Sequence, residues 1–325
     1  MALDAEQILR ASRRPLIIGM GGGGDVVGAL ATAEAMRAGD GAEPLVGGLT
    51  WERRPVDPVP GPRTAEEIEC ARVIADGVML AGASTRVRGR DVYFAESRMA
   101  AVLERPTVLI DIDIGPARVA AGLAEAVAEL DRDLTVFVDV GGDVLAGGDE
   151  PGLRSPLCDS VMLAAAALLG RRGHPVLLGV FGIGCDAELT PDEVLERLAR
   201  VAAADGLCGA RGLTEPVALV LERALEFVAT EASAQAVRAF RGVSGEVLIR
   251  GGTRALQLSP LAAITFFLDV EATLASAGRL AREVIDAVDL EAANDALHAV
   301  GVRSELDFER AAAGQAGWEP PPLTS

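Results

Sequence analysis

The sequence predicts an α/β protein with a mainly parallel sheet and helices on both faces. Short runs of Val, Ile and Leu, such as PLIIGM and LTVFVDV, are apolar without alternation, which is typical of strands buried on both faces. Helical patterns separate these runs, as they do where right-handed crossovers join parallel strands. We therefore expect a Rossmann-like core followed by a C-terminal α+β extension.

The predicted elements follow from this alternation in chain order. Apolar runs predict strands at residues 15–20, 43–48, 77–81, 107–112, 134–140 and 175–181. Apolar residues at helical spacing predict helices at 25–38, 93–104 and 116–130. Two more helices are expected to begin at Pro156 and Pro191, because proline is favoured in the first helical turn. A proline-rich loop is expected at 51–63.

The pattern changes after residue 213. We expect residues 1–213 to form the Rossmann-like core and 214–313 the extension, with helices to about 240, strands at 245–250 and 264–269, and a final helical part. The last segment, 314–325, contains Trp318 and a proline-rich run and reads as a flexible tail.

Composition excludes several classes of function. The net charge is −18, which disfavours nucleic acids and anionic membranes as partners. The chain contains no lysine, so Schiff-base chemistry, covalently bound pyridoxal phosphate and a Walker A lysine are excluded. Only two histidines and four scattered cysteines are present, which disfavours histidine-based triads and zinc sites. Since no apolar segment resembles a signal peptide or a membrane span, we expect a cytoplasmic protein, and a homo-oligomer is left open.

A run of glycines follows the first predicted strand and precedes a helix. Glycines allow positive φ and let a ligand approach the backbone, and the start of the following helix favours an anion. We therefore expect the run to bind a phosphate or carboxylate group, with these residues in contact: Gly21, Gly22, Gly23, Gly24 and Asp25. A tight turn with Asp25 as the helix N-cap is the alternative. A dinucleotide site is disfavoured, because its ribose-binding acid would lie near Glu43, away from a clear strand end.

Acidic residues follow two later strands. Asp139 and Asp143 lie at the end of one strand, Asp186 follows another, and Asp159 lies in a predicted helix start. Parallel strands end at one edge of a sheet, so we expect these acids near the glycine run. Crowded carboxylates favour a divalent cation, Mg²⁺ or Mn²⁺, with Asp143, Asp159 and Asp186 as ligands. Asp139, Asp143 and Asp186 are the candidate catalytic acids. Helix capping and hydrogen bonding to ligand hydroxyls are the alternatives.

Four further residues are candidates for ligand binding. Trp51 and Arg53 follow the second predicted strand, where they could wall a pocket and pair with an anion. Arg86 and Arg88 lie in an arginine-dense segment of an otherwise acidic chain, which suits recognition of carboxylate or phosphate. The alternatives are that Trp51 is packed in the core, that Arg53 forms a surface ion pair, and that Arg86 and Arg88 are solvated surface charges.

Several motifs together resemble one known family. They are GMGGGGDVVGAL, GGLTWER, DPVPGPR, FVDVGGDVLAGG, SPLCDSVML, FGIGCDAEL and RGGTRALQLSP, in this order along the chain. The sequence thereby resembles the uncharacterised family known as domain of unknown function 1152, over nearly its whole length. The resemblance implies no activity or residue roles.

From the residues we expect an enzyme that acts on a small anionic metabolite, phosphorylated or carboxylated. With no lysine and almost no histidine, proton transfer would depend on carboxylates or a metal. A lyase, hydrolase or transferase fits this better than a nicotinamide-dependent oxidoreductase. The alternative is a non-catalytic protein that binds a nucleotide or metabolite, which would need the glycine run but no converging acids.

Overall fold

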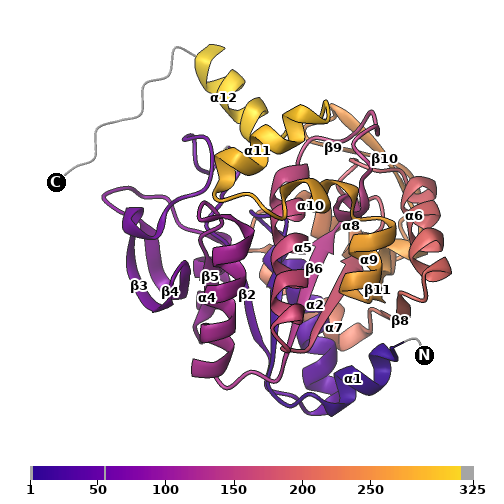
Figure 1. The fold of residues 1–325 in the computed structure, drawn as a ribbon. Coiled ribbons are helices and arrows are strands. Elements are labelled where there is room, and N and C mark those ends of the chain that lie inside the picture. The colour runs from indigo at the N-terminus through magenta and orange to yellow at the C-terminus, as the bar shows by residue number, and fades with distance from the viewer. Residues whose placement is uncertain (1–2, 55, 316–325) are drawn as a thin grey trace.

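A single large sheet forms the centre of the computed structural model, which describes residues 3–54 and 56–315 (Figure 1). Five parallel strands make up its middle, in the spatial order β5 (Thr107–Ile110), β2 (Leu45–Leu49), β1 (Pro15–Gly19), β6 (Leu134–Val140) and β7 (Val176–Phe181). The predicted α/β fold is confirmed. Nearly all of the predicted tail at 314–325 lies outside the described residues.

Antiparallel strands extend the sheet on both sides. The hairpin of β3 (Ile68–Ala75) and β4 (Val78–Val87) pairs with β5. On the other side, β11 (Ile264–Leu268) lies antiparallel between β7 and β8 (Leu207–Gly212). A separate hairpin contains β9 (Gly245–Ile249) and β10 (Arg254–Leu258). The C-terminal segment therefore adds one strand to the main sheet and contributes a small second sheet.

Helices cover both faces because alternate side chains of each strand point to opposite faces. Leu16 and Ile18 of β1 pack into one core, whereas Ile17 packs into the other. The first core is covered by α4 (Gly115–Glu129), α5 (Pro156–Arg171), α6 (Pro191–Ala203), α9 (Val270–Ser276), α10 (Arg279–Val284), α11 (Leu290–Ala299) and α12 (Glu305–Gln315). The second is covered by α1 (Ala5–Ala11), α2 (Asp25–Asp40), α3 (Ala95–Leu103), α7 (Glu215–Leu225) and α8 (Glu231–Phe240).

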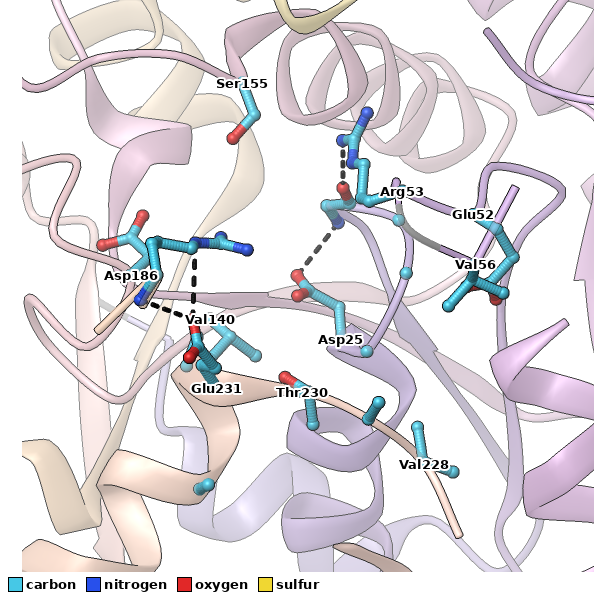
Figure 2. A pocket seen from close by; sticks show the side chains of 18 of the residues that line it. Asp25, Glu52, Arg53, Val56, Val140, Ser155, Asp186, Val228, Thr230 and Glu231 are labelled. Atoms are coloured by element: carbon cyan, nitrogen blue, oxygen red, sulfur yellow. Dashed lines mark hydrogen bonds and ion pairs between the residues drawn. The ribbon is translucent and has the colours of Figure 1, made fainter. Parts of the chain in front are cut away.

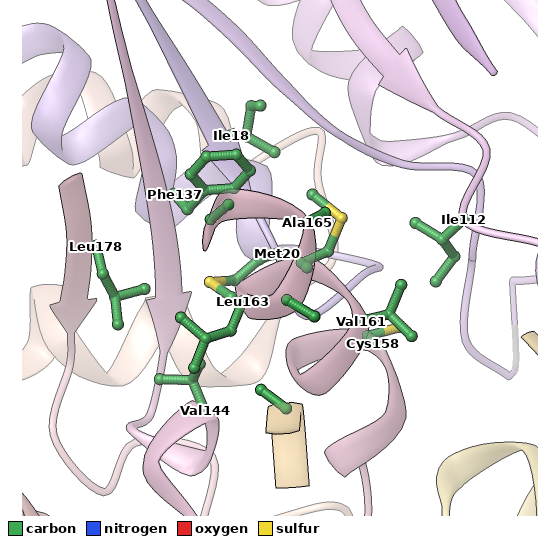
Figure 3. Close-up of a cluster of buried hydrophobic side chains, with 14 of the residues drawn as sticks. Ile18, Met20, Ile112, Phe137, Val144, Cys158, Val161, Leu163, Ala165 and Leu178 are labelled. Atoms are coloured by element: carbon green, nitrogen blue, oxygen red, sulfur yellow. The ribbon is translucent and has the colours of Figure 1, made fainter. Parts of the chain in front are cut away.

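Helix α5 lies at the centre of the first core. Its residues 156–167 are all buried, and Val161 and Leu163 pack around Met20, Phe137 and the other side chains drawn in Figure 3. Small alanines in α5 let the neighbouring helices α4 and α10 approach closely, which suits a core with few aromatic residues. This rigid helix fixes the position of Asp159, which is buried in it.

The order of the parallel strands creates a switch point between β1 and β6. The chain proceeds from β1 to β2 and β5 on one side, and then to β6 and β7 on the other. Ligands of open parallel sheets bind at such a point, beyond the carboxyl ends of the strands. The glycine run follows β1. Asp139 lies at the end of β6 and Asp143 lies just after it, so both segments reach this crevice.

The structure differs from the sequence expectations in three edge strands. β3, β8 and β10 were not predicted, and β4 is longer than the strand expected at 77–81. All four carry exposed or half-buried polar residues, so the continuous apolar pattern is missing. Helix boundaries differ from expectation by a few residues. No helix in the described ranges combines the length and the apolar character that crossing a bilayer requires.

Candidate functional site

A cavity of about 610 Å³ opens at this switch point (Figure 2). Its floor contains the glycine run and the acidic loops, and one wall comes from the segment that joins α7 to α8. Among its lining residues are seven carboxylates and three guanidinium groups: Asp25, Glu52, Asp143, Asp159, Asp186, Glu188 and Glu231, beside Arg53, Arg54 and Arg250. The lining therefore has an excess of acidic groups.

The glycine run forms a tight turn between β1 and α2. Gly22 and Gly23 have φ of +77° and +55°, which favours glycine at both positions. The Gly23 amide donates to the Trp51 carbonyl at 2.8 Å. Gly24 is the N-cap of α2 and provides no side-chain cap, so the start of the helix has amides that no side chain satisfies.

Asp25 is the first residue of α2, whereas the sequence suggested an N-cap. Its carboxylate turns back and accepts a hydrogen bond from the Gly21 amide at 3.0 Å. The turn therefore contains a carboxyl group, where a dinucleotide-binding turn would present only amides to the pyrophosphate. This arrangement disfavours a dinucleotide site.

Two groups of three carboxylates lie at the floor of the cavity. The first contains Asp25, Asp139 and Asp159, and the second contains Asp143, Asp186 and Glu188. Within each group one oxygen from every residue lies within 4.8 Å of the others. We call them the first and second triplets. Asp139 and Asp143 come from the end of β6 and the turn that follows it, so they link the two triplets.

Several oxygens of the triplets are buried without a hydrogen-bond donor. Neither oxygen of Asp139 has a partner in the described structure, although the residue is only 1% exposed. The amides of Gly142 and Val144 lie near the Asp139 carboxylate, but not in good hydrogen-bond geometry. The Asp143 carboxyl group can form a hydrogen bond with Asp139 only if one of the two groups is protonated. One oxygen each of Asp159 and Asp186 is also unpaired. Such groups are costly unless a proton or a cation satisfies them.

Burial makes these carboxyl groups weak acids. It raises the pKa of Asp139 to about 7 and, together with the charge of Asp139, raises that of Asp25 to about 8. Burial and the neighbouring carboxylates raise the pKa of Asp143, Asp159 and Asp186 well above the ordinary range. Without a cation, part of the cluster therefore holds protons at neutral pH.

Arg53 is the cation held most firmly beside the triplets. One guanidinium nitrogen donates to the Gly21 carbonyl at 2.7 Å and lies 3.4 Å from the Cys158 sulfur and 3.4 Å from Glu305. The guanidinium stacks 4.6 Å from the centre of the Trp51 ring. Burial raises the pKa of the Cys158 thiol and the nearby Arg53 lowers it. The effect of burial is the larger, so the pKa is raised. Cys158 is therefore a neutral neighbour of the site.

Helix α12 closes this side of the site. Glu305 accepts hydrogen bonds from the amides of Leu157 and Cys158, both at 2.9 Å, and so caps α5 from a distant part of the chain. Glu309 accepts from the Trp51 indole at 3.0 Å and from the Gly61 amide at 2.9 Å. The C-terminal helix thereby holds the loop that carries Arg53.

The structure brings together most of the candidate residues, but not all. Gly21 to Gly24, Asp25, Arg53, Asp143, Asp159 and Asp186 line the cavity, and Asp139 completes the first triplet. Trp51 is fully buried behind it and is a packed residue. Arg86 and Arg88 lie on and after β4, beyond β5, where Arg86 pairs with Glu69 at 2.7 Å and Arg88 donates to the Glu66 and Ile68 carbonyls. Arg86 and Arg88 therefore do not line the cavity, in contrast to the expectation that they bind the ligand.

Other lining residues had no assigned role in the sequence. Glu188 completes the second triplet and accepts a hydrogen bond from the Ser155 hydroxyl at 2.6 Å. Glu52 follows the true end of β2, whereas the expected ribose-binding position near Glu43 lies before that strand. The position of Glu188 two residues after Asp186 was a usable signal. Arg54, Arg250 and the segment at 225–234 reach the cavity only through tertiary packing.

Comparison with known proteins identifies the family but not an activity. The model of the family described as a protein of unknown function, DUF1152, matches residues 16–313. The chain therefore belongs to this family, in agreement with the resemblance of its motifs. No curated protein and no solved structure matches the chain.

Proposed function

We propose that this member of the DUF1152 family is a divalent-cation-dependent enzyme that acts on a small anionic metabolite. The reaction would be a hydrolysis, an elimination or a group transfer. The observation that supports this most is the convergence of two carboxylate triplets at one cavity at the switch point of the sheet, which five of the six residues line. The buried and unpaired oxygens of Asp139, Asp159 and Asp186 give those carboxylates a need for cations.

The chemistry of the donors fits Mg²⁺ or Mn²⁺. Each triplet offers only carboxylate oxygens, which hard divalent cations prefer. Cys158 is a neutral thiol against Arg53, and both histidines bond elsewhere, His174 to Thr135 and His298 to Asp307. Soft or nitrogen-binding metals therefore have no matching donors among the residues of the triplets.

Charge also argues for cations. Seven acids and three arginines line the cavity, so the ionised lining would repel an anion. Two divalent cations carry the charge needed to offset this excess. With the acids neutralised, the amides at the start of α2 and the arginines can attract an anionic ligand.

Individual residues have separable roles in this proposal. Asp143, Asp159 and Asp186 hold cations, with Asp25, Asp139 and Glu188 completing the two triplets. Bound cations would polarise an oxygen of the substrate. Gly22 to Gly24 line the cavity at the start of α2, where the anion would lie.

A non-catalytic metabolite-binding protein is the competing function. Such a protein needs the glycine run and an anchoring arginine, but it gains nothing from carboxylates that are buried without partners. Strongly shifted acids that gather in a cleft are more typical of catalytic sites. The proposal therefore favours an enzyme.

Calorimetric titration of the purified chain with Mn²⁺ tests the proposal. We expect binding in the wild type and at least tenfold weaker binding in Asp143→Asn, which keeps the shape of the side chain but removes a negative ligand. Asp149→Asn is the matched control, because this neighbouring acid has an 82% exposed side chain. Absence of Mn²⁺ binding in the wild type, or equal binding in Asp143→Asn, contradicts the proposal.

A further inference from the structure

We infer that the substrate is a phosphate ester of an aliphatic, non-aromatic group. This inference rests on the proposed function and specifies its substrate class. The observation behind it is that the cavity lining combines the carboxylate triplets with several aliphatic residues and no aromatic one, and also contains arginines.

The cavity lining combines acids with a set of aliphatic residues. In Figure 2, Val56 and Val228 lie on the opposite side of Asp25 from Asp186, with Glu52 beside Val56 and Val140 beside Asp186. The α7–α8 segment adds further aliphatic residues to the lining: Leu225, Ala229, Ala232 and Ala234. A ligand that contacts both the triplets and these aliphatic residues must join a charged group to an apolar one.

The aliphatic residues of the lining favour an aliphatic group over a nucleobase. None of the described lining residues is aromatic, so a base would find no ring on which to stack. The nearest tryptophan, Trp51, is fully buried and donates its indole N–H to Glu309. Valine, leucine and alanine instead offer an aliphatic surface. Burial of a hydrocarbon group of the ligand against this surface is favourable.

Arginines at the edge provide a second attraction for the charged group. Arg54 lines the cavity and is exposed, and it makes no ion pair or hydrogen bond within the described part of the chain. Arg250 also lines it, and its only ion pair there is a long one of 3.8 Å to Glu231. Arg54 can therefore turn toward a ligand, and Arg250 would give up only this long contact to do so.

The number of donors favours phosphate over carboxylate. Two cation-binding triplets, the two arginines at the edge and the uncapped start of α2 surround the same space. A carboxylate has two oxygens, whereas a phosphate monoester has three terminal oxygens that can each accept several contacts. Phosphate is therefore the group that satisfies this set of donors most completely.

Calorimetry of the Mn²⁺-loaded protein with simple probes tests the inference. We expect butyl phosphate to bind about tenfold more tightly than methyl phosphate, since each buried methylene contributes up to about fourfold. Hexanoate and adenosine monophosphate should bind more weakly than butyl phosphate. Ala229→Asn, an exposed lining position, should reduce the preference for butyl over methyl phosphate, and Arg54→Gln should weaken both by a similar factor.

Each result separates the two claims. Tighter binding of hexanoate overturns the choice of phosphate, and tighter binding of adenosine monophosphate, or equal binding of methyl and butyl phosphate, overturns the aliphatic group. In those cases Mn²⁺ binding and the proposed function stand. If Mn²⁺ itself does not bind, the proposed function fails and this inference fails with it. Leu219→Asn, at an exposed residue of α7 outside the cavity lining, is the control.

Discussion

The carboxylate of Asp25 accepts a hydrogen bond from the amide of Gly21 at 3.0 Å, across the turn that joins β1 to α2. This bond directs an acid into a turn whose glycines would otherwise suit a pyrophosphate. It also brings Asp25 within reach of Asp139 and Asp159, so a motif that looks like an anion loop becomes one part of a carboxylate triplet, for which we propose cation binding.

The first prediction concerns the backbone of this turn. Gly22→Ala should lower the free energy of unfolding by about 1–2 kcal/mol, because Gly22 has φ of +77° and a Cβ would lie 3.1 Å from the Trp51 carbonyl. Gly39→Ala is the matched control in α2, where a Cβ meets nothing within 4 Å. That variant should gain about 0.5–1 kcal/mol. Urea denaturation measures both, and equal effects in the two variants would refute this account of the turn.

The second prediction concerns the support that α12 provides. Glu305→Ala should lower the free energy of unfolding by roughly 3 kcal/mol, because it leaves the amides of Leu157 and Cys158 unsatisfied and removes a carboxylate from half-buried Arg53. Glu283→Ala, at an exposed position of α10, should change it by less than about 0.5 kcal/mol. Similar urea midpoints for the two variants would show that α12 does not support the site.

The sequence predicts the centre of the fold because burial on both faces leaves a continuous apolar pattern. LTVFVDV gives β6 with its correct bounds, since every residue of that strand is buried. The pattern fails at the sheet edges. In β8, LCGARG has three exposed residues and two glycines, and its pairing with β11 depends on a segment more than 50 residues away.

Prediction of which candidate residues lie together succeeds and fails for related reasons. Asp143 and Asp186 follow buried parallel strands, and the topology of such strands brings their ends together. Arg86 is expected near an anion because it lies in an arginine-dense segment, and the apolar pattern ends the strand before it at residue 81. That strand continues as β4 in an antiparallel hairpin, which holds Arg86 against Glu69. The wall at 225–234 reaches the site through Thr230, which packs so closely on Gly24 that a Cβ there would lie 2.1 Å from the Thr230 Cβ.

The third prediction concerns pH. The pKa of Asp25 is raised to about 8 and that of Asp139 to about 7, so between pH 4 and 8 the folded protein holds protons that the unfolded chain has released. The contribution of these two groups to the stability of the metal-free protein is therefore greatest at low pH. It is lost as pH rises through about 7–8. We expect the melting temperature to fall between pH 6 and pH 8.5 without metal.

Divalent cations should reverse this trend. Cation binding requires ionised carboxylates, so Mn²⁺ should bind more tightly and release fewer protons as pH rises from 6 to 8.5. The stabilisation by Mn²⁺ should accordingly increase over that range, as thermal melting with and without the ion will measure. A metal-free protein whose melting temperature rises from pH 6 to pH 8.5 would contradict the burial-raised pKa values.

The most direct test of the central claim is anomalous scattering from a crystal of the wild-type protein grown with Mn²⁺. We predict two anomalous peaks, one bound by Asp25, Asp139 and Asp159 and the other by Asp143, Asp186 and Glu188. A single peak at either triplet would reduce the site to one cation. A map with no peak at either triplet, from crystals that hold Mn²⁺ elsewhere, would contradict the account.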